Sequence, residues 1–315
     1  MHQGSADGNL HDSGTAFAYL SLSVLDVGRQ VLFWEGKWMS KIPAVLIMIL
    51  NYGTYDLTIN LIKQLHSNLN YQSYDIMVVD NCSPNESSKV LEENSKVLNY
   101  IFYANKNNAG YAAGNNIGIR YGINHGYEYT WILNSDVEIQ ERNVLDHMVA
   151  YMENNFQCAA IGPKIYSLEG NICYPYCRRP NCWNMTIGIV QEKKYRKSQA
   201  NISNKVYRLF GCCMLLRNKT MAQIDCMDER TFLYGEEDIL AERLLRAGYY
   251  TYYDADVSVI HMESVSMQRM SKNKKKMQVK ETTKSMKLYL SEYRNYPIFL
   301  SWLCIKVRQL IVKIS

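Results

Sequence analysis

The 315-residue sequence contains no apolar run of the ~20 residues that a membrane-spanning helix requires. Its best run, residues 42–50, is far too short. A secretory signal is also missing, because the weakly apolar stretch 16–25 follows two aspartates and no Lys or Arg. We therefore expect residues 1–38 to be a leader outside the fold, with Met39 as the start of the folded protein.

The nine cysteines lack the pattern of a metal site or a disulfide framework. Cys173, Cys177 and Cys182 contain no C-x-x-C pair and have no His pair nearby, which disfavours structural zinc. Cys212 and Cys213 are adjacent, which does not suit a conventional disulfide. We expect reduced thiols and a cytoplasmic location.

A strong charge of either sign is absent, since the net charge is +5. Much of the excess lies between Lys272 and Lys284. Such a patch can face nucleic acid, an anionic membrane surface or only solvent. We expect no nucleic-acid partner.

Apolar runs alternate with amphipathic stretches through the first half of the chain, which predicts βαβ units around a mostly parallel sheet. No internal repeat accompanies this pattern. The strands are expected at 44–50, 74–79, 99–104 and 129–133, and helices at 56–67, 112–124 and 144–152.

The second half is less regular. Residues 166–206 show little periodicity and are expected to form a long loop or hairpin. Order returns at 206–216, and a helix over 237–247 ends at Gly248. Two short strands, 249–253 and 257–261, precede an amphipathic helical tail from residue 277 to the end.

Polar residues follow each of the first four expected strands, where an open α/β sheet binds its ligands. They should lie along one rim, and they are Asn51, Asp80, Asn81, Gly110, Asn115, Asn134, Ser135 and Asp136. Asp80 can accept the imide N–H of a pyrimidine base, although a helix N-cap or an Asx-turn is the commoner reason for an aspartate at such a position. Asp136 can bind Mg²⁺ or Mn²⁺ beside diphosphate oxygens.

Three consecutive acidic residues, Glu236, Glu237 and Asp238, begin the expected helix at 237–247. The helix dipole favours acids there, but three exceed what capping requires, and a carboxylate is a suitable general base. His261 closes the last expected strand, and could either complete a metal site or be an ordinary core residue.

The succession VLIMILNYGTYDLT, DIMVVDNCSPNES, NAGYAAGNNIGI, WILNSDVEI, FGCCMLLR, FLYGEEDILAERLLRAGYY and VSVIHMES resembles the family-2 inverting glycosyltransferases of the GT-A fold. It is most similar to their bacterial rhamnosyltransferase-like branch. The resemblance covers about residues 42–264 in order. It implies an α/β nucleotide-diphospho-sugar transferase fold over 39–265, followed by a basic linker and helical extension over 266–315.

The resemblance also implies roles. Asp80 stands where the family reads the pyrimidine ring, with Asn51 and Asn81 beside it and Gly110 and Asn115 near the ribose and phosphates. Asn134, Ser135 and Asp136 occupy the Asp-x-Asp motif, and Asp136 and His261 would hold Mg²⁺ or Mn²⁺. Glu237 matches the catalytic base, with Asp238 as the second candidate. Asn134 departs from the motif, because the family has an acid there.

These roles imply an inverting hexosyl transfer from a UDP- or dTDP-sugar to a hydroxyl of a glycan or lipid-linked acceptor, as in surface polysaccharide synthesis. A catalytically silent nucleotide-sugar or glycan-binding module is the alternative, which Asn134 favours. A nucleotidyltransferase or a dinucleotide-dependent oxidoreductase fits less well, since no G-x-G-x-x-G follows the first strand.

Apolar and basic residues alternate over 298–313, which suits a helix lying on the inner face of the plasma membrane. Packing of this tail against the catalytic domain, or against a second subunit in a homodimer, is an equal alternative.

Overall fold

The computed structural model describes residues 31–34, 37–40, 42–262 and 272–314. The chain divides into two compact units, residues 1–42 and 43–315. In the first, β1 (Val31–Trp34) pairs antiparallel with β2 (Lys37–Ser40), across the boundary expected at residues 38 and 39. Residues 1–30 of the expected leader lie outside the described residues.

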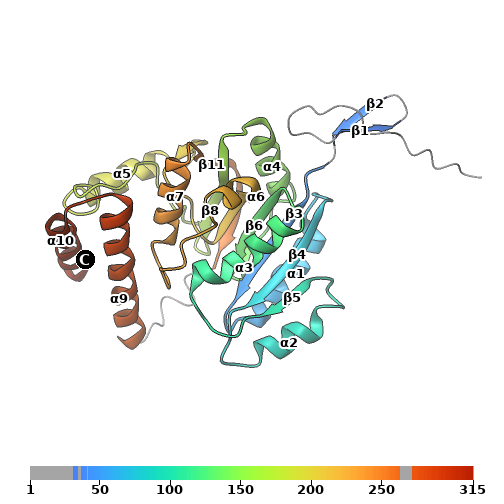
Figure 1. Ribbon diagram of the computed structural model, residues 1–315, viewed down its shortest axis with the longest axis horizontal. Coiled ribbons are helices and arrows are strands. Elements are labelled where there is room, and N and C mark those ends of the chain that lie inside the picture. Colours follow the sequence, from blue (N-terminus) through green and yellow to red (C-terminus); the bar gives the residue numbers. More distant parts are fainter. Residues whose placement is uncertain (1–30, 35–36, 41, 263–271, 315) are drawn as a thin grey trace, which may run out of the picture. The chain divides into compact units, whose positions relative to one another are not determined.

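The second unit is built on one sheet, to which nine strands of the described residues belong (Figure 1). Their order is β5–β4–β3–β6–β10–β8–β11–β7, and β9 pairs with β11. The strands are β3 (Val45–Asn51), β4 (Tyr74–Asp80), β5 (Ile101–Ala104), β6 (Tyr129–Asn134), β7 (Val137–Glu138), β8 (Cys158–Ser167), β9 (Asn204–Val206), β10 (Cys213–Arg217) and β11 (Tyr250–His261).

The sheet is parallel in one half and mixed in the other. β5, β4, β3 and β6 are mutually parallel, as the βαβ pattern predicts. β10 pairs antiparallel with both β6 and β8, whereas β8 and β11 are parallel. The α/β class with a central sheet is therefore confirmed, and the parallel arrangement extends over the half that carries the first four strand ends.

Helices cover both faces of this sheet. One face carries α1 (Tyr55–Asn68), α2 (Ser87–Asn94) and α4 (Val144–Asn154), and the other carries α3 (Tyr111–Asn124), α6 (Asn218–Gln223) and α7 (Glu236–Arg246). Strand β3 shows why: Val45, Ile47 and Ile49 pack into the first layer, whereas Leu46 and Met48 pack into the second. Successive strand side chains point to opposite faces, so an uninterrupted apolar strand must be buried on both.

Glycines bring α3 close to the sheet. Gly114, Gly118 and Gly122 recur every fourth residue and so share one face of the helix. A Cβ atom on Gly114 would lie 2.7 Å from Leu50 Cδ1, and one on Gly122 would lie 2.6 Å from Thr130 Oγ1. The absence of side chains here allows the beginning of α3 to approach the strand ends.

Three sequence expectations were wrong. The segment 166–206 is not only loop, because it contains α5 (Ile189–Ser198), a helix that buries no side chain and therefore shows no apolar periodicity. The strands expected at 249–253 and 257–261 are one strand, β11, with an irregularity between Asp254 and Ser258. Residues 206–216 are not one element, since β9 ends at Val206 and β10 begins at Cys213.

The tail is helical, as expected. It consists of α9 (Lys272–Leu288), a short π-helix η1 (Tyr289–Tyr293) and α10 (Ile298–Ile314). Tyr289, Leu290 and Ile305 form a small core with Ile239 of α7, so the extension packs against that helix. Part of the expected basic linker, residues 266–271, lies outside the described residues, and the remainder enters α9. No helix in the described part of the chain is long and apolar enough to cross a membrane.

Candidate active site

The ends of β3 and β4 place Asn51 and Asp80 side by side. They are register partners in the parallel pair, and Asn51 Nδ2 donates to Asp80 Oδ1 over 2.7 Å. Ser83 adds a hydroxyl bond of 2.5 Å to Oδ1 and a backbone N–H bond of 3.1 Å to Oδ2. Asp80 therefore bonds the backbone three residues on within a local turn, and it is not a helix N-cap, because α2 begins at Ser87. The turn holds a buried carboxylate at the strand end.

Side-chain amides continue the rim toward α3. Asn81 Nδ2 donates to Asn108 Oδ1 (3.0 Å) and to Gly110 O (3.3 Å), and Asn105 Nδ2 donates to Asn81 Oδ1 (3.0 Å). Asn115 is fully buried in the first turns of α3 and donates to Tyr111 O. Sequence reasoning missed Asn105 and Asn108, although the run NKNN between a strand and a helix is a usable signal.

The end of β6 is tied to the end of β3. Ser135 Oγ lies 2.9 Å from Thr54 Oγ1, and Thr54 in turn donates to Asn51 Oδ1. The backbone N–H of Asn134 donates to Cys212 O over 2.9 Å, which links this strand end to the beginning of β10. Thr54 was not among the predicted residues, and the helix-start position it occupies gave no functional signal.

Asp136 and His261 meet as the resemblance implies. His261 pairs with Val137 across β11 and β7, and its Nε2 lies 3.2 Å from Asp136 Oδ1. Met262 N–H also donates to Asp136 O, which fixes the two segments together. Among the described residues no group of three or more His, Cys, Asp or Glu side chains is arranged to hold a metal. Asp136 and His261 are therefore a pair of adjacent side chains of the types that bind divalent cations, and no third such side chain joins them in the described part of the chain.

The three acids at the start of α7 have different surroundings. Glu236 is buried. Asp238 forms an ion pair of 2.9 Å with Arg208, so its charge is already balanced. Glu237 lies over Gly211, because a Cβ atom on that glycine would be 2.8 Å from Glu237 Oε1 and 3.1 Å from Tyr111 OH. Gly211 is thus the residue type that leaves room for this carboxylate.

Burial and like charge shift the protonation of this cluster. Burial, and then the negative charge of Glu237, raise the pKa of Glu236 well above 4.5. Burial also raises the pKa of Tyr111, with Glu237 and Glu236 adding to the effect. Both shifts favour the neutral form, so Glu236 adds less negative charge beside Glu237 than an ordinary carboxylate would.

The loop before α7, residues 224–235, is held in place by contacts on two sides. Tyr111 N–H donates to Phe232 O, and Gly110 (φ +102°) lies so close to Phe232 that a Cβ atom would be 2.7 Å from its Cα. Asn116 of α3 exchanges two hydrogen bonds of 2.9 Å with Met227. These contacts hold the loop against the beginning of α3.

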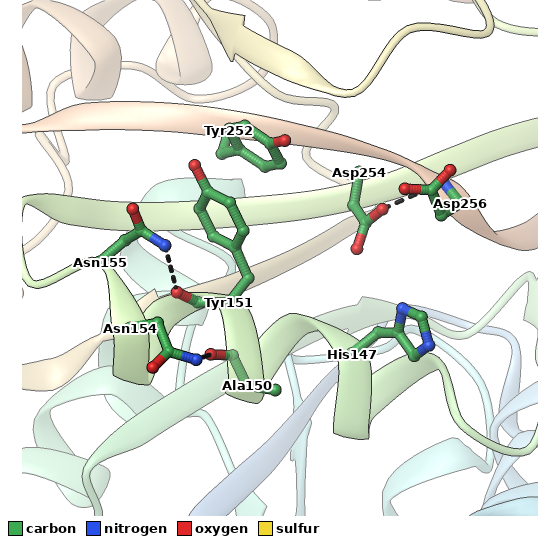
Figure 2. A pocket seen from close by; sticks show the side chains of 8 residues that line it. All are labelled: His147, Ala150, Tyr151, Asn154, Asn155, Tyr252, Asp254 and Asp256. Atoms are coloured by element: carbon green, nitrogen blue, oxygen red, sulfur yellow. Dashed lines mark hydrogen bonds between the residues drawn. The ribbon is translucent and has the colours of Figure 1, made fainter.

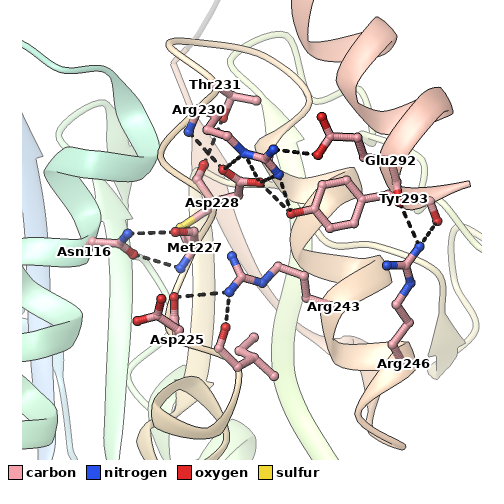
Figure 3. A network of polar contacts seen from close by, with 11 residues as sticks. Asn116, Asp225, Met227, Asp228, Arg230, Thr231, Arg243, Arg246, Glu292 and Tyr293 are labelled. Atoms are coloured by element: carbon pink, nitrogen blue, oxygen red, sulfur yellow. Dashed lines mark hydrogen bonds and ion pairs between the residues drawn. The ribbon is translucent and has the colours of Figure 1, made fainter.

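On the opposite side the loop is bound to η1 (Figure 3). Arg230 contacts Asp228 at 2.6 Å and Glu292 at 2.5 Å, and Tyr293 OH donates to Asp228 Oδ2. Although burial opposes ionisation, Arg230 and Tyr293 lower the pKa of Asp228 to about 2. The C-terminal extension therefore helps to position the segment that leads into Glu237.

Contacts connect all the predicted residues into one continuous rim. Asn81 bonds Gly110, whose neighbour Tyr111 bonds the loop before α7. Asn134 bonds Cys212, whose neighbour Gly211 lies beneath Glu237. The arrangement brings the half-buried carboxylate of Glu237, a His–Asp pair and a row of amides to one edge of the sheet.

A separate hollow of about 370 Å³ lies between α4 and β11 (Figure 2). Tyr151 and Tyr252 stack there with ring centroids 3.8 Å apart, and Asp254 and His147 line the opposite part. None of the predicted site residues lines it. The chemistry at the strand ends, and not the size of this hollow, identifies the candidate site.

Comparison with known proteins identifies the family of the chain. The model of the family described as "Glycosyl transferase family 2" matches residues 45–224. The low-salt glycan biosynthesis hexosyltransferase Agl10 of Haloferax volcanii is 25% identical over 224 residues, which are 71% of this chain and 68% of that protein. An N-acetylglucosaminyl-diphospho-decaprenol L-rhamnosyltransferase of Mycobacterium tuberculosis is 29% identical over 124 residues, or 36% of this chain and 40% of that one.

A solved structure has the same fold. The mannosyltransferase PcManGT from Pyrobaculum calidifontis, in complex with GDP-Man and Mn²⁺, superposes with a TM-score of 0.57 at 11% identity. The superposition covers 86% of this chain and 74% of that one. At this identity the likeness establishes the fold and leaves the choice of donor sugar to other arguments.

Proposed function

This chain belongs to glycosyl transferase family 2 and is a glycosyltransferase of the GT-A fold, and from that premise we propose that it transfers a hexose from a UDP- or dTDP-sugar, with inversion, to a hydroxyl of a glycan or lipid-linked acceptor. The observation that carries the proposal is the contact chain from Asn134 through Cys212 and Gly211 to Glu237. It joins the end of a sheet strand to the carboxylate best suited to act as base. The catalytic domain in this proposal spans 39–265 and the extension 266–315.

The donor would lie along the strand ends. Asp80 would accept the imide N–H of the base at its Oδ2, while Asn51 and Ser83 hold the carboxylate in place. Asn81, Asn115, Asn134 and Ser135 would position the ribose and the phosphates, with Gly110 allowing close approach. Fixed amides and hydroxyls suit this task because they orient the donor without adding negative charge beside its diphosphate.

Asp136 and His261 would hold a divalent cation. His261 Nε2 and Asp136 Oδ1 lie 3.2 Å apart. One carboxylate with one imidazole would suit Mn²⁺ or Mg²⁺ if oxygens of the sugar nucleotide supplied further ligands. A bound cation offsets the charge that develops on the departing nucleoside diphosphate. Asn134 contributes no charge to this site, so Asp136 would be its principal anionic ligand.

Glu237 would remove the acceptor proton. Asp238 is engaged by Arg208 and Glu236 is neutral and buried, so Glu237 is the acid of the three that is poised to accept a proton. The deprotonated hydroxyl would then attack the anomeric carbon in line with the leaving diphosphate, which inverts the configuration.

Glu237→Gln tests this assignment. Loss of a general base typically lowers the rate by about 10² to 10⁴, so transfer should fall by that factor while donor affinity changes little. Hydrolysis of UDP- and dTDP-sugars in the presence of Mn²⁺ measures turnover without knowledge of the acceptor, and calorimetry with the free nucleotide measures affinity. Equal turnover of variant and wild type would remove Glu237 from the role.

Asp238→Asn is the matched control, because it changes the neighbouring acid in the same way. It breaks the ion pair with Arg208 but leaves the proposed base in place, so the loss of turnover should be much smaller than for Glu237→Gln. The reverse order of effects would assign the base to Asp238.

Asn134 favours a second candidate, a catalytically silent nucleotide-sugar or glycan-binding module. Such a protein would bind UDP or dTDP and hydrolyse no sugar nucleotide under any metal condition. Asn134→Asp discriminates further: it should strengthen Mn²⁺-dependent nucleotide binding in either case, but should raise turnover only in an enzyme.

A lipid-linked acceptor in surface polysaccharide synthesis is the physiological setting we propose, at the inner face of the plasma membrane. The mycobacterial relative is by its name a transferase to a diphospho-decaprenol, which supports this choice of acceptor class. A homodimer formed through α10 is the alternative use of the tail.

A further inference from the structure

We propose that a groove between the loop before α7 and the first half of α9 binds the diphosphate and adjoining hydrocarbon of a lipid-linked acceptor, an inference that rests on the proposed function. The groove has a volume of about 470 Å³ and is lined by Phe232, Lys276, Met277, Lys280 and Glu281. Nothing in the catalytic roles assigned above uses any of these side chains.

The groove adjoins the catalytic loop directly. Phe232 precedes Glu237 by five residues, and its carbonyl accepts the N–H of Tyr111 at the start of α3. Farther along α9, Ser285 packs against Gly235, where a Cβ atom would lie 3.0 Å from Ser285 Cβ. Helix α9 therefore runs beside the segment that ends in Glu237.

Charge complementarity points to an anion. Helix α9 contains seven lysines and one glutamate, and Lys276 and Lys280 are one helical turn apart on the groove side. Glu237 follows Phe232 by five residues and is a carboxylate. It would repel an anionic acceptor, so the charged part of the acceptor needs a cationic surface nearby while its hydroxyl reaches the base.

The lining also suits hydrocarbon. Phe232 and Met277 present apolar surface, and the methylene stems of Lys276 and Lys280 extend it while their ammonium groups stay in water. A flexible thioether adapts to irregular apolar ligands. Glu281 offsets one of the two lysines, so the lining keeps a net positive charge on an apolar floor. Such a groove matches a diphosphate joined to a prenyl chain better than it matches a free diphosphate or a neutral glycan.

The experiment measures binding of farnesyl diphosphate, inorganic diphosphate and farnesol to the full chain by calorimetry. Lys276→Glu/Lys280→Glu reverses the charge of the groove, and Lys284→Glu/Lys287→Glu makes the same change at exposed positions of α9 that do not line it. We expect affinity for farnesyl diphosphate to fall roughly tenfold or more in the first variant and less than about twofold in the second, because contact ion pairs outweigh screened distant charges. Met277→Ser should lower the affinity for farnesyl diphosphate but leave the affinity for inorganic diphosphate unchanged.

Equal losses of farnesyl diphosphate affinity in the two double variants would overturn the proposal. They would mean that the ligand is attracted by the overall positive charge of α9 and not by the groove. It would also fail if inorganic diphosphate bound as tightly as farnesyl diphosphate, or if the groove variant lost affinity only for phosphatidylglycerol vesicles. Donor hydrolysis separates this result from the proposed function: the groove variants should hydrolyse the donor like wild type. A wild-type protein that hydrolyses no donor would contradict the proposed function, and the farnesyl diphosphate measurements would still decide the groove.

Discussion

At the scale of single residues, three neighbouring acids of the candidate site differ because their surroundings differ. Glu236, Glu237 and Asp238 are consecutive, yet one is buried and neutral, one lies over a glycine and one is paired with Arg208. Environments that separate the protonation of neighbouring acids are typical of catalytic clusters. The assignment of Glu237 as base depends on these differences and not on its position in the motif alone.

The raised pKa of Glu236 leads to a prediction about stability and pH. The folded protein binds this proton more tightly than the unfolded chain does, so unfolding free energy falls as pH rises from about 4.5 toward the raised pKa. Glu236→Gln removes this dependence. Relative to wild type, the variant should gain about 1.4 kcal/mol for each pH unit within that window, measured by urea unfolding at several pH values.

Glu242→Gln on the same helix is the control with the opposite sign. Burial opposes ionisation of Glu242, but hydrogen bonds from Arg179 and Tyr207 hold its pKa below 4.5. Its carboxylate therefore stabilises the fold above that pH, and the stabilisation is lost on acidification. A Glu236→Gln profile that runs parallel to the Glu242→Gln profile would contradict the buried, neutral state of Glu236.

The sequence predicts these residues better than it predicts their partners. Asp80, Asp136 and Glu237 stand out because a strand end or a helix start makes an acid conspicuous. Arg208 and Thr54 do not, because each acts through a contact with a residue distant in sequence. Such contacts exist only after the sheet has brought the segments together.

At the scale of elements, the junction of α3 with the loop before α7 is the tightest point near the site. Gly110 has a φ of +102° and no space for a Cβ atom against Phe232. Gly110→Ala combines backbone strain with a backbone clash, and should lower the free energy of unfolding by about 2 to 4 kcal/mol. It should also lower kcat, because moving Phe232 displaces Glu237.

Gly126→Ala supplies the control for that substitution. Gly126 also has a positive φ, +77°, but nothing lies within 4 Å of its would-be Cβ. Gly126→Ala should lower the free energy of unfolding only by the backbone strain, about 1 kcal/mol, and leave turnover unchanged. Comparable losses of turnover in the two variants would show that the close approach at Phe232 does not position the base.

Elements with a clear apolar pattern were predictable, and those without one were not. Helix α1 and strands β3, β4 and β6 match their predicted ranges to within about two residues, which is the usual uncertainty of element ends. Helix α5 buries no side chain, so nothing in its sequence marks an inward face. Strand β8 has polar and glycine positions that hid it, although it is the partner of both β10 and β11.

At the scale of the whole chain, the C-terminal extension has two sides with different surroundings. Its inner side packs on α7 through Tyr289 and Leu290 and on the catalytic loop through Glu292 and Tyr293. Its outer side, on α10, leaves large apolar side chains exposed, namely Ile298, Phe299, Trp302, Leu303 and Leu310. The sequence indicated an amphipathic tail but could not say which side would be buried.

The exposed side of α10 predicts binding to a membrane surface. Aromatic and aliphatic side chains next to Lys306 and Arg308 suit the boundary between headgroups and acyl chains of an anionic bilayer. Phe299→Ser/Trp302→Ser should weaken co-sedimentation with phosphatidylglycerol vesicles roughly tenfold or more, since each buried aromatic contributes about 1.5 to 3 kcal/mol. These substitutions spare Cys304 and Ile305, which are buried against the extension's core, so folding should be preserved.

Val97→Ser/Phe156→Ser removes equally exposed apolar side chains elsewhere on the catalytic unit, and should leave vesicle binding unchanged. Sedimentation of both variants without vesicles tests whether this surface instead joins two copies of the chain. If the α10 substitutions halve the molecular mass in solution and leave vesicle binding intact, the apolar side joins two copies of the chain. The acceptor would then have to reach Glu237 from solution or from a neighbouring membrane protein, and the lysines of α9 would be its first contact.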